Sequence, residues 1–243
     1  EVAALRRRGV ADARSEPVRD ALAALRDRRP VGLIAELKKA SPSRGLIRAD
    51  FAAARLARAY ADGGAHVLSV LTDRRYFQGD PLYLRQARAA CPLPVLRKDF
   101  IIDDLQVRET AGMNADAMLL IVAMLEQPRL EDLYASCCAQ ALTPLVEVHD
   151  EREMERACAL NAALVGINNR DLRDFSVDVA TTERVARYAL PGMLLVSESG
   201  IFTADDITRV RAAGATAVLV GESLMRQDDV AAAVHALLRT SRD

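Results

Sequence analysis

"RAAGATAVLV" (residues 211–220) is the stretch that decides the fold, because its residue pattern recurs in two other parts of the chain. The stretches "ADGGAHVLSV" (61–70) and "AGMNADAMLL" (111–120) show the same order: the end of a helix, a turn of small residues and a β-rich apolar run. A helix that leads through such a turn into a buried strand is half of a βα unit. The three stretches therefore indicate one repeated βα unit.

The chain of 243 residues contains eight short, nearly continuous apolar runs, as expected for parallel strands covered on both faces. The runs begin at residues 31, 66, 93, 116, 142, 163, 193 and 216, with helical segments between them. Eight βα units in this length predict an α/β fold, the closed (β/α)8 TIM barrel. An open, doubly wound sheet is the alternative, but no GxGxxG or Walker sequence follows any of the runs.

Two of the helical segments have recognisable ends. In "DFAAARLARAYADGG", Asp50 is the predicted N-cap, and the helix is expected to stop at Gly63 and Gly64. In "TADDITRVRAAGA", Thr203 is the predicted N-cap and Gly214 marks the end.

The chain is expected to divide into an N-terminal helical extension (1–30) and a catalytic barrel domain (31–243). The extension is rich in arginine, and we expect one of its helices to cover the lower mouth of the barrel. A basic arm for nucleic acid is disfavoured, because no aromatic residue is interleaved with the arginines.

Composition argues against several classes of partner. The formal net charge is −1, so no overall field favours nucleic acid or anionic lipid. The longest apolar run, 117–125, has about half of the ~20 residues that span a bilayer, and no secretory signal is recognisable. The cysteines lack metal-site spacing and are expected to be buried free thiols in a reducing cytoplasm: Cys91, Cys137, Cys138 and Cys158.

Charged residues follow the apolar runs at the ends where barrels of this type carry their chemistry. In "IAELKKASPSRG" (34–45), Glu36 and Lys38 share the parity of Ile34, so they should point into the barrel mouth, whereas Lys39 should not. The same alternation predicts further inward polar residues at strand ends: Lys98, Glu147, Asn168 and Glu198. One such residue is compatible with an ordinary salt bridge. Five strands with the same pattern favour an active site in which the charges compensate one another.

A phosphate site is expected beside these charges. "SESG" (197–200) ends the seventh strand and "GES" (221–223) ends the eighth, and the loops after these strands often hold phosphate in TIM barrels. Glycine lets backbone amides approach an anion, and Ser223 would begin a short helix.

These motifs together resemble the indole-3-glycerol-phosphate synthase family, the ring-closing decarboxylases of tryptophan biosynthesis. The matching stretches lie in family order between residues 31 and 226: "IAELKKASPSRG", "SVLTDRRYFQGD", "LPVLRKDFIID", "LVEVHDE", "INNRDL", "SESGI" and "LVGESLM". The resemblance implies a lyase that converts 1-(2-carboxyphenylamino)-1-deoxyribulose 5-phosphate into indole-3-glycerol phosphate, carbon dioxide and water. It implies no metal and no organic cofactor, and a monomer is the working expectation.

The resemblance also implies roles for particular residues. Lys98 resembles the general acid of ring closure and Glu147 the general base. Lys38 resembles a lysine that contacts the substrate and acts as an acid in dehydration. The remaining implied site residues form three groups: the orienting residues Glu36, Asn168 and Glu198; the phosphate cradle of Ser199, Gly200, Gly221, Ser223 and Arg170; and the apolar ring pocket of Phe77, Phe100, Leu119 and Leu172.

Two loop residues and two alternative functions remain to be considered. Ser41 belongs to a loop that closes over the substrate, and His149 is expected to make a hydrogen bond within its loop. A phosphoribosylanthranilate isomerase would use a cysteine and aspartate pair, but no cysteine ends the first strand. A barrel that only binds a phosphorylated ligand would need neither Lys98 nor Glu147.

Overall fold

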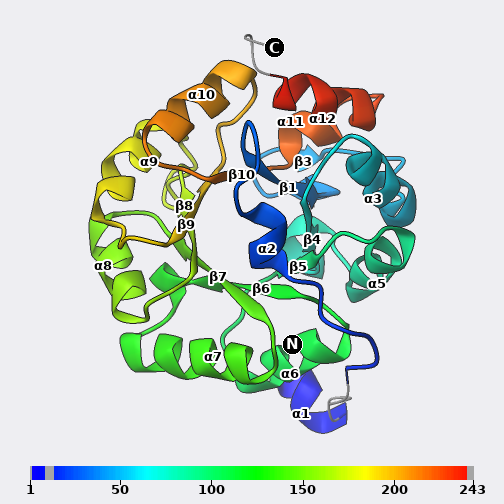
Figure 1. Ribbon diagram of the computed structural model, residues 1–243. Coiled ribbons are helices and arrows are strands. Elements are labelled where there is room, and N and C mark those ends of the chain that lie inside the picture. Colours follow the sequence, from blue (N-terminus) through cyan, green and yellow to red (C-terminus); the bar gives the residue numbers. More distant parts are fainter. Residues whose placement is uncertain (1, 9–13, 240–243) are drawn as a thin grey trace.

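Eight parallel strands close into a barrel in the computed structural model, which describes residues 2–8 and 14–239 (Figure 1). The order around the barrel is β1-β10-β9-β8-β7-β6-β5-β4, and β4 pairs with β1 to close it. The predicted (β/α)8 barrel is therefore confirmed. The strands are β1 (Gly32–Leu37), β4 (Val67–Leu71), β5 (Val95–Lys98), β6 (Ala117–Ile121), β7 (Thr143–Val148), β8 (Leu164–Asn168), β9 (Leu194–Glu198) and β10 (Ala217–Val220).

Helices surround the barrel on its outer side (Figure 1). They are α3 (Ala53–Asp62), α5 (Pro81–Ala90), α6 (Asp104–Gly112), α7 (Gln127–Ala139), α8 (Glu151–Ala159), α9 (Ala180–Val185), α10 (Ala204–Ala212) and α12 (Val230–Leu238). The remaining elements are α1 (Val2–Arg8), α2 (Ala21–Leu25), α4 (Arg74–Phe77), α11 (Glu222–Met225), the 3₁₀ helices η1 (Val122–Met124) and η2 (Ala186–Tyr188), and the hairpin strands β2 (Ala40–Ser41) and β3 (Gly45–Leu46). No helix within the described residues is long and apolar enough to cross a membrane.

Alternation along the strands produces two hydrophobic layers. One parity of each strand fills the barrel interior, in a cluster that contains Ile34, Leu96, Leu145 and Val196. The opposite parity packs under the helices, in the larger cluster that contains Leu33 and Val146. Both faces of every barrel strand are therefore buried, which explains why the strands read as continuous apolar runs.

The repeated turns share one backbone conformation. Gly64, Asn114 and Gly214 occupy the same place in their stretches, and each has a positive φ, of 96°, 61° and 106°. Glycine and asparagine adopt this left-handed conformation at the lowest cost, so they end the helix and turn the chain into the next strand.

One predicted helix cap is confirmed and one is wrong. Thr203 is the N-cap of α10, and its side chain accepts a hydrogen bond from the Asp206 amide. The N-cap of α3 is Ala52, without a side-chain hydrogen bond, instead of Asp50. The Asp50 carboxylate lies two residues too early for this position and pairs with Arg48 at 2.9 Å and Arg55 at 2.8 Å.

The helix expected over the lower mouth of the barrel is α2. Its residues Ala21 and Leu25 are buried and belong to the same hydrophobic cluster as the barrel interior. The division between an extension and a barrel domain stays a prediction, and residues 9–13 of the extension lie outside the described residues.

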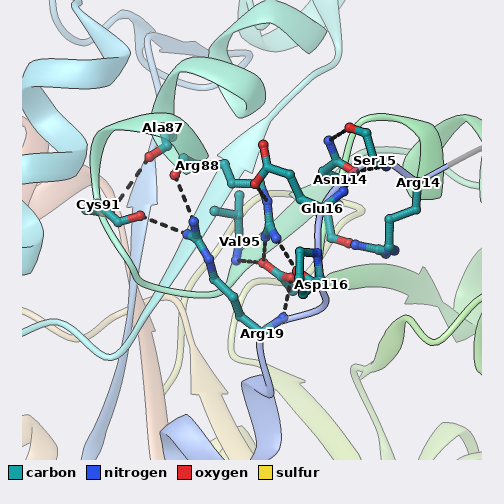
Figure 2. Close-up of polar contacts among 12 residues, drawn as sticks. Arg14, Ser15, Glu16, Arg19, Ala87, Arg88, Cys91, Val95, Asn114 and Asp116 are labelled. Atoms are coloured by element: carbon teal, nitrogen blue, oxygen red, sulfur yellow. Dashed lines mark hydrogen bonds and ion pairs between the residues drawn. The ribbon is translucent and has the colours of Figure 1, made fainter.

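The segment before α2 is fixed to the bottom of β5 and β6 by a buried polar cluster (Figure 2). The fully buried Asp116 carboxylate accepts hydrogen bonds from the Arg88 guanidinium and, at 2.8 Å each, from the Arg19 and Val95 amides. The Arg19 guanidinium in turn donates to the carbonyl oxygens of Cys91 (2.8 Å) and Leu93 (2.7 Å).

The same segment is held at a second point. Asn114 accepts hydrogen bonds from the Ser15 amide at 2.9 Å and the Glu16 amide at 3.2 Å, and Glu16 pairs with Arg88 at 3.1 Å. Residues about 100 positions apart in the sequence therefore share one network at the lower mouth.

Asp116→Asn is expected to lower the free energy of unfolding by about 3 kcal/mol, because it leaves the Arg88 guanidinium buried beside a neutral amide. Urea denaturation measures the change. Asp132→Asn, on the exposed face of α7, is the matched control and should change stability by less than about 0.5 kcal/mol. Equal effects of the two substitutions would contradict a structural role for the Asp116 charge.

Candidate active site

A pocket of about 380 Å³ opens at the C-terminal ends of the barrel strands. All of the residues that the sequence singled out for catalysis or substrate binding line it: Glu36, Lys38, Ser41, Phe77, Lys98, Phe100, Leu119, Glu147, Asn168, Arg170, Leu172, Glu198, Ser199, Gly200, Gly221 and Ser223. The barrel thus brings together residues from all eight strand ends that are up to 187 positions apart, Glu36 and Ser223 being the extremes.

The ammonium group of Lys98 lies between two carboxylates. Its Nζ atom is 3.1 Å from Oε2 of Glu147 and 3.5 Å from Oε2 of Glu198. Both glutamate side chains are 2% exposed, so little water screens these charges. Burial lowers the pKa of Lys98, but the carboxylates of Glu147, Glu198 and Glu36 outweigh burial and raise this pKa, so Lys98 is a cation.

Glu36 and Lys38 form a second ion pair at the end of β1. The Nζ atom of Lys38 is 2.7 Å from Oε1 of Glu36. Burial alone would raise the pKa of Glu36, but the charges of Lys38 and Lys98 hold it below its ordinary value. Lys39, on the other parity, does not line the pocket.

Two glycines make room for the carboxylates. A Cβ atom on Gly166 would lie 2.0 Å from Oε1 of Glu198, and one on Gly221 would lie 2.4 Å from Oε1 of Glu36. Such distances exclude any side chain at these two positions unless the carboxylates move. The missing side chain at Gly166 therefore leaves room for the Glu198 carboxylate.

The carboxylates differ in their preferred protonation state. Burial tends to raise the pKa of Glu147, but Lys98 and His149 reverse this and keep Glu147 ionised. For Glu198, burial and the charges of Glu147 and Glu36 outweigh the attraction of Lys98 and raise its pKa. Neighbouring carboxylates with opposite pKa shifts are suited to separate proton-transfer roles.

His149 is the site residue that sequence reasoning underestimated. Its Nδ1 atom makes the expected local hydrogen bond, 3.0 Å from Oε2 of Glu153. Its Nε2 atom also faces the active site, 3.4 Å from Oε1 of Glu147. The one-residue separation from Glu147 in a strand-end loop was the only signal in the sequence, and alternation does not specify where a loop side chain points.

The ends of β8 and β9 form a polar wall. Oδ1 of Asn168 accepts hydrogen bonds from the Ser199 hydroxyl (2.9 Å) and the Arg170 amide (3.0 Å). Ser199 and Gly200 have φ of 65° and 79°, so the chain turns sharply at the pocket rim. Ser223 lies beside this turn, because its hydroxyl donates to the Ile201 carbonyl at 3.3 Å.

An apolar wall stands at the ends of β4 to β6. The rings of Phe77 and Phe100 have centroids 6.2 Å apart, and Tyr76 meets Phe100 edge-on at 6.1 Å. Leu119 is buried in the same wall, whereas Leu172 lies in the loop after β8 and is 45% exposed. The pocket therefore has a flat apolar side suited to an aromatic ring and a polar side suited to an anion.

A buried network supports Lys98 from behind. Arg97, on the opposite parity of β5, is fully buried and donates to Thr72, Asp99, Glu109 and Thr110 at 3.0 Å each. These bonds fix the end of β5 against α6 and the loop after β4. The position of the neighbouring Lys98 is restricted as a result.

Comparisons with known proteins identify the family of the chain. The family model described as indole-3-glycerol phosphate synthase matches residues 2–237. The indole-3-glycerol phosphate synthase of Azospirillum brasilense is 51% identical over 231 residues, which cover 93% of this chain and 88% of the relative. That of Rhizorhabdus wittichii is 53% identical over 207 residues, which cover 85% of this chain and 78% of the relative.

Solved structures with low sequence identity share the barrel. The 3-hexulose-6-phosphate synthase has a TM-score of 0.66 at 16% identity and covers 85% of this chain and 98% of its own. The N-acetylmannosamine-6-phosphate 2-epimerase of Clostridium perfringens has a TM-score of 0.65 at 14% identity, over 87% of this chain and 93% of its own. These likenesses concern the fold alone. The family match and the relatives at about 50% identity show that the chain belongs to the indole-3-glycerol phosphate synthase family.

Proposed function

We propose that this pocket carries out the family's reaction, the ring closure of 1-(2-carboxyphenylamino)-1-deoxyribulose 5-phosphate with loss of carbon dioxide and water. The observation that carries the proposal is the enclosed Lys98 ammonium, 3.1 Å from Glu147 and 3.5 Å from Glu198, at the centre of the pocket. A site that only binds a phosphorylated ligand has no use for this arrangement. None of the chain's four cysteines, all within the described residues, lines the pocket, so the cysteine of the isomerase alternative has no counterpart.

Lys98 acts in the first step. When the aromatic carbon attacks the ketone, negative charge develops on the ketone oxygen. A lysine held as a cation by surrounding carboxylates stabilises this charge and supplies the proton. The carbon–carbon bond forms as the carbonyl π-electrons move to oxygen. Carbon dioxide then leaves, and the electron pair of the bond that it breaks stays on the ring and neutralises the ring cation.

Glu147 and Lys38 act in the later steps. The dehydration removes a hydroxyl group as water and a proton from the substrate, so it needs an acid and a base. Glu147 is ionised in the free site and takes the proton. Lys38 provides the proton for the leaving hydroxyl, while Glu36, Asn168 and Glu198 orient the lysines and the substrate hydroxyls.

The two walls of the pocket orient the substrate. Ser199, Gly200, Gly221, Ser223 and Arg170 hold the phosphate on the side of β8 to β10. Phe77, Phe100 and Leu119 hold the anthranilate ring on the side of β4 to β6, together with Leu172 from the loop after β8. Ser41, in the hairpin after β1, closes over the bound substrate.

We expect the enzyme to work in the cytoplasm and to bind no nucleic acid. The four cysteines are free, which fits a reducing cytoplasm, but the expectation that all are buried is wrong: Cys137 is buried and Cys138 is exposed at the surface of α7. The net charge of −1 offers no general attraction to nucleic acid. We expect a monomer, which light scattering of the purified chain tests.

Lys98→Met is expected to lower the rate of ring closure by at least about 100-fold, because acid catalysis acts in the transition state. Binding of a product analogue should stay within about tenfold, since phosphate and ring contacts hold the ground state. Product fluorescence measures the rate. Lys39→Met, outside the pocket, is the matched control, and near-normal turnover of Lys98→Met would refute the assigned role.

Glu147→Gln keeps the shape of the side chain and removes the base. The variant should fold, bind substrate and make no product at any pH, because an amide cannot take the proton. The melting temperature and the rate are measured on one sample, with Glu155→Gln on the exposed face of α8 as control. If Glu147 is only a salt-bridge partner, the variant will be less stable and still active.

Ser223→Asp is expected to weaken the binding of inorganic phosphate and of a product analogue, because it sets a carboxylate against a dianion. Ser223→Ala removes only the hydroxyl and should weaken binding much less. Titration of both folded variants decides the matter. Unchanged affinity in Ser223→Asp would place the phosphate site elsewhere in the pocket.

A further inference from the structure

His149 lies between two carboxylates at the point where β7 leads into α8. Its Nδ1 atom is 3.0 Å from Oε2 of Glu153, and its Nε2 atom is 3.4 Å from Oε1 of Glu147. The side chain is 14% exposed. An ionised carboxylate only accepts hydrogen bonds, so Nδ1 carries the proton that binds Glu153. In a neutral ring, the lone pair of Nε2 would then face the ionised Glu147, whereas a proton on Nε2 makes this contact an ion pair. The geometry therefore favours the imidazolium form.

Glu153 fixes the ring from the first turn of α8. The N-cap residue Asp150 accepts a hydrogen bond from the Glu153 amide at 2.9 Å. The Glu153 carboxylate reaches back and also accepts the His149 amide at 2.7 Å. Backbone and ring of His149 thus bind the same carboxylate oxygen, which leaves the ring one direction in which to present Nε2.

The two oxygens of Glu147 have different partners as a consequence. Oε1 faces His149, and Oε2 faces Lys98 at 3.1 Å. A carboxylate held at both oxygens cannot rotate freely about its last torsion. Oε2 therefore stays directed towards the centre of the pocket, where the substrate reacts.

The carboxylates around His149 also favour its charged form. Burial lowers the pKa of His149, but Glu147 and Glu153 outweigh burial and raise it to about 10. Asp171, in the loop after β8, also interacts with the charge of His149.

We propose that His149, held by Glu153, is a positioning residue that remains an imidazolium at neutral pH and keeps the Glu147 carboxylate ionised and directed at the substrate. This inference rests on the proposed role of Glu147 as general base. It assigns His149 and Glu153 to the machinery of the reaction although neither touches the substrate.

The effect of the charge on the pH profile has a definite sign. Activity requires ionised Glu147 and is lost as the pH falls through its pKa. Removing a cation beside Glu147 raises that pKa, so the acidic limb of kcat should move to higher pH. An opposite charge at this distance shifts a carboxyl pKa by about one to three units, and the remaining Lys98 places the expected movement at about one unit.

The test compares His149→Gln with His235→Gln, the same substitution on the exposed face of α12. For each variant, kcat and KM are measured across the acidic limb by product fluorescence, together with the melting temperature. In His149→Gln the limb should move up by about one pH unit with KM nearly unchanged. His149→Lys, which restores a cation, should return the limb towards its original place. An unmoved limb, even with a lower melting temperature, would overturn the inference.

Nuclear magnetic resonance of the unmodified chain provides a second measurement that does not depend on the folding of a variant. The chain has three histidines, so the His149 ring signals can be assigned by their loss in any folded His149 variant or by their contact with Glu153. They should show a doubly protonated ring at neutral pH, and titration near the ordinary value of about 6.5 would contradict the proposal. An active Glu147→Gln would refute the base itself. An inactive Glu147→Gln with an unmoved limb in His149→Gln would refute only the role of His149.

Discussion

The structure depends on one constraint: charges that are removed from water must compensate one another. Lys98 is stable in the barrel mouth because Glu147 and Glu198 lie within 3.5 Å, and those carboxylates are tolerated because Lys98 is there. Space for this cluster comes from backbone without side chains, at Gly166 beside Glu198 and at Gly221 beside Glu36. Arg97 uses the same principle on the outer face of β5, where its guanidinium meets Asp99 and Glu109. The chemistry of the pocket is thus a consequence of how the strand ends neutralise each other.

Much of this could be predicted from the sequence, because a strand has only two faces. Once Ile34 was assigned to the barrel interior, alternation placed Glu36 and Lys38 at the mouth, and the same argument placed Lys98, Glu147 and Glu198. Closure of the barrel then required that these ends meet. The fold itself was indicated by small residues at positions such as Gly64 and Gly214, where a positive φ ends a helix. Which substrate the pocket takes came from family resemblance, since a charged mouth is common to many barrels.

The features that escaped prediction lie where no such rule operates. Alternation stops at the last strand residue, so it could not show that His149 turns back towards Glu147. Asp50 has the side chain of an N-cap, but α3 begins two residues later than its position requires, and Arg48 and Arg55 bind its carboxylate. The polar cluster around Asp116 joins residues about 100 positions apart, a contact that local sequence does not encode. In each case the contact depends on how loops and helices pack, which alternation along a strand does not describe.

The fixed segment before α2 has a consequence for the order in which the chain acquires its structure. Ser15, Glu16 and Arg19 are made early on the ribosome, but their partners Asn114 and Asp116 follow 97 to 99 residues later. These hydrogen bonds therefore cannot form until β6 has emerged, and closing so long a loop is slow. The segment before α2 therefore reaches its final position only after the middle of the chain has been made. During synthesis the apolar residues Ala21 and Leu25 of α2 have no partners to pack against until the barrel interior forms.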